Sequence, residues 1–141
     1  MDILGHLQPT QDALAMQQTR LQVIAENIAQ AQTTRDVDGQ PFQRREVVFS
    51  AFLDRNASAP TSRTELPRLQ VEGIRQDDTP GQRVFQPGHP HADEEGYVTY
   101  PNVSISMEMV DLLQASRAYE ANLQVVRTSR ELAEKAMNIS R

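Results

Sequence analysis

The stretch LAMQQTRLQVIAENI, residues 14–28, places leucine or isoleucine at every seventh position, namely Leu14, Leu21 and Ile28. The same spacing extends back to Leu7. A seven-residue apolar repeat forms a narrow stripe along an α-helix, and such a stripe is buried against a second helix. The N-terminal segment is therefore predicted to be a helix that requires a helical partner.

The C-terminal segment carries a corresponding stripe, in which mostly apolar side chains recur every three or four residues. Its positions are Met109, Leu112, Ser116, Tyr119, Leu123, Val126, Arg130, Ala133 and Met137. Each stripe is the natural partner of the other, so the two ends are predicted to pair as a long antiparallel coiled coil.

Apolar residues at helical spacing usually form an intramolecular core. Here the seam is imperfect, because Ser116 and Arg130 interrupt it. A second set of apolar residues also lies outside the seam, and neighbouring subunits could cover that set. Its members are Leu4, Val23, Val110, Leu113 and Val125.

The middle of the chain has a different character, since it contains six of the seven Phe and Tyr residues and most of the Gly and Pro. The predicted fold class is α+β, with a small β-rich module between the paired helices. The predicted boundaries are 1–34 for the N-terminal helix, 35–103 for the module and 104–141 for the C-terminal helix. A flexible loop is expected at about 54–67, where Ser, Thr, Pro and Ala dominate.

Alternating apolar and polar residues between turn signals predict four strands in the module. These strands are residues 43–53, 68–75, 84–85 and 97–100. Gly73, inside the second strand, predicts a bulge or a bend. The main N-terminal helix is predicted over residues 12–32. The C-terminal helix is predicted to begin after Ser104, its N-cap, and to end near Ile139.

Composition argues against several classes of function. The 141 residues include no cysteine, so disulfides, a thiolate nucleophile and a cysteine-based zinc site do not arise. The net charge is −5 and no run of Lys or Arg occurs, which argues against nucleic acid as a partner. No apolar run approaches the ~20 residues needed to span a bilayer, so direct membrane insertion is not expected. Residues 1–7 lack the features of a cleaved secretory signal.

His89 and His91, followed by Asp93, Glu94 and Glu95, form the one candidate metal site in the sequence. Two imidazoles two residues apart on a loop can share an ion with a carboxylate. An exposed turn is the favoured interpretation, because no third neutral ligand is fixed nearby. A nucleophile elbow, a phosphate loop and a dinucleotide fingerprint are all absent from the sequence. The sequence therefore predicts neither an enzyme nor a cofactor, and no catalytic or metal-binding residue is assigned.

Two terminal stretches resemble the signatures of bacterial flagellar rod and hook proteins. Residues 21–31, LQVIAENIAQA, resemble the N-terminal signature, and residues 108–122, EMVDLLQASRAYEAN, resemble its C-terminal counterpart. Glu26 and Gln30 depart from the pattern, which has Ser or Thr at the first position and Asn at the second. Contacts that those side chains make in relatives are therefore not carried over to this chain.

The middle of the chain narrows the resemblance to the proximal-rod members of the family. The stretches that carry it are DGQPF at 38–42, VVF at 47–49, PGHPHADEEGYV at 87–98 and YPNV at 100–103. The similarity covers nearly the whole chain. Its order and spacing are more specific than any single motif.

The resemblance implies a structural subunit of the proximal rod of the bacterial flagellar basal body. Such a subunit polymerises helically and transmits torque from the membrane ring to the distal rod and hook. The implied partners are further copies of the chain, other flagellar rod proteins, the adaptor between rod and membrane ring, and the flagellar type III export apparatus. The implied location is the periplasm-spanning rod, which such subunits reach without a cleaved signal peptide.

The resemblance also suggests which residues form the assembly interface. The helical wall is assigned to Leu14, Leu21, Ile24, Ile28, Leu112, Tyr119, Leu123 and Val126. Asn27 and Asn122 are assigned polar contacts that fix axial register, with solvated surface amides as the simpler alternative. The alternative functions are another rod paralogue, a non-flagellar helical adaptor, and a metal-binding module at His89 and His91.

Overall fold

The computed structural model describes residues 8–37, 39–52 and 68–139. These form two helices and four strands, in the order α1 (Gln8–Gln30), β1 (Arg45–Phe52), β2 (Arg68–Gln76), β3 (Arg83–Phe85), β4 (Tyr97–Thr99) and α2 (Ile105–Ile139). The predicted α+β fold class is confirmed. The predicted loop at residues 54–67 lies outside the described residues, as does Leu4.

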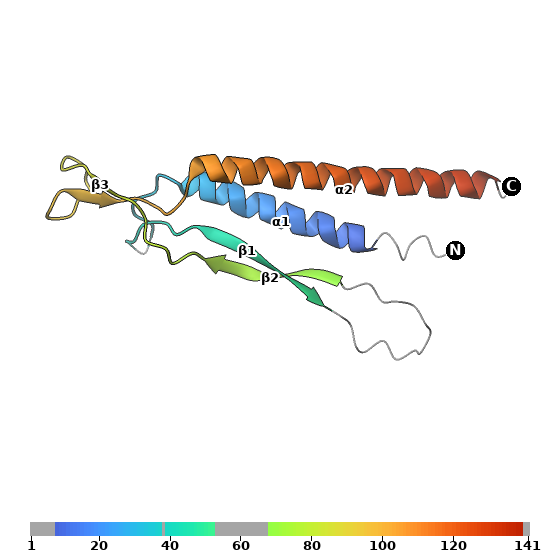
Figure 1. Cartoon of the computed structure of the whole chain (residues 1–141), viewed down its shortest axis with the longest axis horizontal. Helices are drawn as coiled ribbons and strands as arrows, with labels where there is room; N and C mark the ends of the chain where they lie inside the picture. The colour runs from blue at the N-terminus through green and yellow to red at the C-terminus, as the bar shows by residue number, and fades with distance from the viewer. Residues whose placement is uncertain (1–7, 38, 53–67, 140–141) are drawn as a thin grey trace.

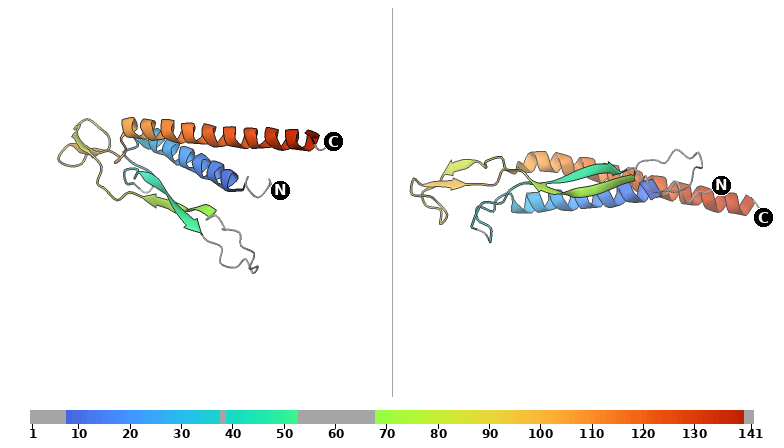
Figure 2. Two further views of the ribbon diagram at one scale, coloured as in Figure 1. Left: turned by 45° about the vertical axis from the view of Figure 1, so that its right-hand side comes forward. Right: turned by 90° about the horizontal axis from the view of Figure 1, so that it is seen from below.

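The two helices run antiparallel and side by side, so the start of α1 and the end of α2 lie toward the same end of the molecule (Figure 1). At 1.5 Å per residue, the 23 residues of α1 span about 34 Å and the 35 residues of α2 about 52 Å. As a result, α2 extends past the described start of α1 (Figure 1). A second face of α1 is covered by the β1–β2 hairpin, so α1 lies between α2 and the hairpin (Figure 2).

The seam between the helices is centred differently from the predicted stripe. On α2 the most buried side chains are Glu108 and Ala115, seven residues apart, whereas Met109 is 53% exposed and Met137 is 66% exposed. The apolar pattern did not reveal this seam, because its central positions carry polar or small side chains. A small residue such as Ala115 lets the backbones of two helices approach closely.

Val23 on α1 corrects a second expectation. The sequence assigned it to an apolar set outside the seam, yet Val23 and its neighbour Ile24 are both buried. The reason is that α1 is covered on two sides, by α2 and by the hairpin (Figure 2). A helix with two covered sides buries a broader stripe than the narrow seam of a two-helix coiled coil.

The β1–β2 hairpin is antiparallel and contains the predicted bulge. Val48 pairs with Gly73 and Phe49 pairs with Val71, so Glu72 is the extra residue. Strands β3 and β4 form a separate two-stranded sheet. That sheet lies beyond one end of the helix pair, the end at which α1 ends and α2 begins (Figure 1). The middle section is thus two hairpins with different neighbours.

Candidate functional site

Asn27, near the C-terminal end of α1, is 1% exposed and acts as a hydrogen-bonding partner for the first residue of β1. Its Oδ1 accepts the backbone N–H of Arg45 at 2.9 Å, and its Nδ2 donates to the Arg45 carbonyl at 2.8 Å. The second Nδ2 hydrogen reaches Glu108 Oε2 at 3.1 Å. One amide side chain therefore joins α1, β1 and α2.

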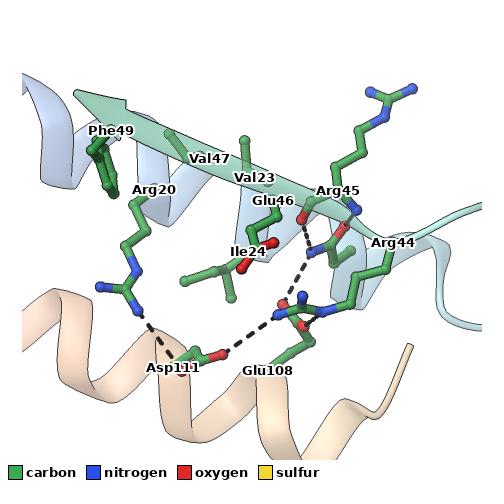
Figure 3. Close-up of a pocket in the computed structure, with 11 residues that line it drawn as sticks. Arg20, Val23, Ile24, Arg44, Arg45, Glu46, Val47, Phe49, Glu108 and Asp111 are labelled. Carbon is green, nitrogen blue, oxygen red and sulfur yellow. Dashed lines mark hydrogen bonds and ion pairs between the residues drawn. The ribbon is translucent and has the colours of Figure 1, made fainter. Parts of the chain in front are cut away.

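Glu108, in the first turn of α2, is also 1% exposed. Its Oε1 accepts a 2.6 Å hydrogen bond from Nε of Arg44, while Oε2 accepts from Asn27 (Figure 3). A buried carboxylate is tolerated when both oxygens are hydrogen-bonded and its charge is paired. Glu108 meets both conditions.

Arg44 also faces a second carboxylate on α2. Its guanidinium lies 3.7 Å from Asp111, whose other oxygen lies 3.8 Å from Arg20 of α1 (Figure 3). Burial by itself would lower the pKa of Arg44. The hydrogen bond and negative charge of Glu108 outweigh that effect, so the pKa lies above its usual value. Arg44 therefore keeps its charge inside the fold.

Asn102, in the segment that leads into α2, fastens the hairpin to that segment. Its Oδ1 accepts the backbone N–H of Arg44 at 2.7 Å, and its Nδ2 donates to the Asp77 carbonyl at 2.9 Å. The N–H of Asp77 in turn donates to the Arg44 carbonyl at 2.8 Å. The five residues Asn27, Arg44, Arg45, Asn102 and Glu108, called here the polar junction, therefore connect both helices with the base of the hairpin.

A cavity of about 370 Å³ adjoins the polar junction, between β1, α1 and α2 (Figure 3). Its apolar lining is Val23 and Ile24 from α1 and Val47 and Phe49 from β1. Charged side chains surround these residues and pair largely with one another, as Arg44 does with Glu108 and Asp111. Because its charged groups are paired with one another, the cavity is better suited to holding β1, α1 and α2 together than to reacting with a small molecule.

The residues assigned to the assembly interface are all buried or half-buried within the chain. Ile24 and Asn27 are buried. The half-buried members are Leu14, Leu21, Ile28, Leu112, Tyr119, Asn122, Leu123 and Val126. The side-chain atoms of Asn27 are used within the chain. The role of all these residues between subunits remains a prediction.

No sequence pattern indicates a role for Glu108, Arg44 or Asn102 individually. Glu108 follows the usual preference for an acid in the first turn of a helix, which suggests no tertiary role. The two departures from the family pattern do make local contacts. Glu26 lies 3.5 Å from the guanidinium of Arg45, and the Gln30 side-chain oxygen accepts from the Thr33 hydroxyl at 2.6 Å at the end of α1.

His89 and His91 lie close together, with ring centroids 5.3 Å apart. Nδ1 of His89 accepts the backbone N–H of His91 at 3.1 Å, and Nδ1 of His91 lies 2.8 Å from the Thr34 hydroxyl. These contacts connect the turn before β4 to the segment that follows α1. Within residues 8–37, 39–52 and 68–139, no three His, Cys, Asp or Glu side chains gather as a metal site would require.

Asp93 organises the turn that leads into β4. Its Oδ1 accepts the backbone N–H groups of Tyr97 at 2.8 Å and Glu95 at 3.0 Å, and Arg83 binds Oδ2 at 2.5 Å. The Tyr97 backbone hydrogen bond and the Arg83 guanidinium lower the pKa of Asp93 below its usual value.

In the part of the chain that is described, neither helix combines the length and apolar character needed to cross a membrane.

Comparison with known proteins identifies the family. A family model described as "Flagellar basal body rod FlgEFG protein C-terminal" matches residues 94–139. The flagellar basal-body rod protein FlgC of Yersinia enterocolitica is 38% identical over 139 residues, which covers 99% of this chain and 98% of the relative.

FlgC proteins of two further bacteria also match. The Salmonella typhimurium protein is 37% identical over 90% of each chain. The Aquifex aeolicus protein is 35% identical over 96% of this chain and 95% of the relative. The match to the Yersinia enterocolitica protein, at 99% of this chain, includes both helices and both hairpins. The chain therefore belongs to the FlgC family of flagellar basal-body rod proteins.

Proposed function

We propose that this chain, a structural rod subunit of the flagellar basal body, forms part of the proximal rod. It polymerises helically with further copies of itself and with other rod proteins, and it transmits torque from the membrane ring to the distal rod and hook. The observation that carries the proposal is the match to FlgC relatives over nearly the whole chain.

The polar junction supports a role in transmitting torque. A subunit that transmits torque has to keep its helices and its hairpin in fixed relative positions. Asn27 and Glu108, both 1% exposed, hold α1, β1 and α2 together through hydrogen bonds of 2.6–3.1 Å. Buried and fully hydrogen-bonded networks of this kind favour a single arrangement of the surrounding elements. The role is structural and involves no catalysis.

The proposed partners include the adaptor that joins the rod to the membrane ring and the flagellar type III export apparatus. The chain would pass through that apparatus unfolded, without a cleaved signal peptide, and fold as it assembles. The small core supports this route. Within the described residues the buried apolar side chains are Val23, Ile24, Ala31, Phe42, Val98 and Ala115. A core of this size stabilises the isolated chain only modestly against the entropy of unfolding.

Purified basal bodies test the proposal. We expect an antibody against the chain to detect it in rod-containing particles, and to detect it in the cytoplasm when flagellar type III export is blocked. Blocking the general secretion route should leave its export unchanged. Basal bodies that retain a rod but lack the chain would contradict the structural role. Continued export after the flagellar apparatus is blocked would contradict the proposed route.

A further inference from the structure

Gln17 of α1 carries a polar side chain at the heptad position that Ile24 and Ala31 occupy farther along the chain. Ile24 and Ala31 are both buried. Among the residues that the structure describes, Oε1 of Gln17 is the one buried side-chain nitrogen or oxygen without a hydrogen-bond partner. Such orphaned acceptors are rare, because burying one without a donor costs free energy. The fold of the single chain therefore leaves a hydrogen bond unmade at Gln17.

The register of the helix pair shows which part of α2 lies opposite Gln17. The hydrogen bond between Asn27 and Glu108 places those two residues at the same level, and the helices run antiparallel (Figure 1). Ten residues back along α1 therefore correspond to ten residues onward along α2, so Gln17 is level with Ala118. Asn122 lies four residues beyond that level, which is about 6 Å along the helix axis.

The side chains of Gln17 and Asn122 lean toward each other. Helical side chains point toward the N-terminus of their own helix. In an antiparallel pair, Gln17 therefore leans toward the level of Asn122, and Asn122 leans back toward the level of Gln17. Asn122 also follows Glu108 and Ala115 at seven-residue intervals, and both of those residues are 1% exposed. The two amides are thus within reach of each other across the helix pair.

Asn122 has the donor that Gln17 lacks. Its side chain is half-buried and makes no hydrogen bond within the described part of the chain, so water can still hydrate its amide. Other subunits that surround the helix pair would remove that water. An amide that loses its water without gaining a protein partner costs free energy. Oε1 of Gln17 is an acceptor without a donor at this position.

We propose that Nδ2 of Asn122 donates a hydrogen bond to Oε1 of Gln17 in the assembled rod, and that this bond fixes the axial register of the two helices. This inference rests on the proposed function, because that function surrounds the helix pair with other subunits. A polar residue in an apolar seam specifies register at a cost in stability. The polar junction fastens the helices at Asn27, and the proposed bond fastens them again ten residues away, about 15 Å along α1.

Gln17→Leu separates stability from assembly. Leucine removes the orphaned acceptor, so the urea midpoint of the purified chain should rise by roughly 0.5–1 M. Leucine also cannot accept from Asn122, so the yield of rod-containing basal bodies should fall about tenfold. A residue that only stabilises the fold would not move these two quantities in opposite directions. Gln18→Leu makes the same change at the exposed neighbouring position and should leave the yield unchanged. A midpoint that does not rise, or a yield that does not fall, would overturn the proposal.

Exchanging the lengths of the two side chains tests the contact itself. Gln17→Asn shortens one amide side chain by a methylene group, and Asn122→Gln lengthens the other by the same amount. Each single variant should lower the yield of rod-containing basal bodies about tenfold, whereas the double variant should restore it to near the wild-type level. A double variant that assembles no better than the single variants would overturn the hydrogen bond.

Immunoblots of the same particles separate this inference from the proposed function. Wild-type chain that is missing from rod-containing particles would contradict the rod function itself. Wild-type chain that is present there, together with normal rod yields from Gln17→Asn and Asn122→Gln, would overturn the hydrogen bond and leave the rod function standing.

Discussion

At the scale of single residues, Asn27 explains how a helix and a strand edge can pack without leaving backbone groups unsatisfied. Its amide mimics the hydrogen-bonding pattern of a neighbouring strand, since it accepts from the N–H and donates to the C=O of the same residue, Arg45. Buried backbone groups need such partners because an unpaired one costs about 1–3 kcal/mol. The remaining hydrogen of the amide is used by Glu108.

Asn27→Ala should therefore destabilise the chain by about 2–3 kcal/mol, because it leaves buried groups of Arg45 and Glu108 without a partner. Urea unfolding followed by circular dichroism measures the change. Asn122→Ala is the matched control, because Asn122 is half-buried and makes no side-chain hydrogen bond within the described part of the chain. Its free energy of unfolding should change by less than ~0.5 kcal/mol. Equal effects of the two substitutions would contradict this role of Asn27.

The stability of the turn between β3 and β4 depends on pH through Asp93. The folded state lowers the pKa of Asp93 below its usual value, so the carboxylate stabilises the turn above the unfolded pKa of about 3.9. This contribution is lost as the pH falls through the lower, folded pKa.

The backbone amide of Tyr97 should report this loss as a change in NMR chemical shift below about pH 4. Asp93→Asn should abolish the transition, whereas Glu94→Gln, a change at the neighbouring exposed carboxyl, should leave it in place. A transition that survives in Asp93→Asn would assign it to another group.

At the scale of elements, the helix pair depends on a small residue in its seam. Ala115 is 1% exposed and lies two turns after Glu108 on the same side of α2. Ala115→Leu adds three carbon atoms to a packed position and should cost about 1–3 kcal/mol of unfolding free energy. Ala121→Leu makes the same change at an exposed position of α2 and should be nearly neutral. Urea unfolding of both variants checks this, and a neutral Ala115→Leu would show that the helices do not pack closely there.

The elements themselves could largely be predicted from the sequence, because their signals are local. The C-terminal helix begins at Ile105, directly after the expected N-cap Ser104, and the bulge lies beside Gly73. The first strand was expected at 43–53 and is found at Arg45–Phe52. Periodicity, turn residues and capping preferences depend on neighbours within a few positions, and one sequence contains them.

The polar junction could not be predicted in the same way. Asn27 and Glu108 are 81 positions apart, and Arg44 and Glu108 are 64 positions apart. An apolar pattern identifies the residues that avoid water, but it does not identify polar residues that are buried because they pair with each other. The sequence also offered no measure of how the hairpin would cover α1, which is why Val23 was left for a neighbouring subunit to cover although it is buried within the chain.

At the scale of the whole molecule, the chain is elongated, with α1 between α2 and the hairpin and a second hairpin beyond one end of the pair (Figures 1 and 2). Such a shape exposes a large surface relative to its core, which suits a subunit whose stability is completed by its neighbours. The exposed apolar residues of α2 and of the hairpin are the surfaces available for those neighbours.

Electron cryotomography of the cell envelope in a strain that lacks this gene tests the central claim most directly. The account predicts membrane rings without a rod or a hook, and restoration of both by the wild-type gene. An intact rod and hook in the deletion strain would contradict it, because a subunit of the proximal rod is required before any later segment can assemble.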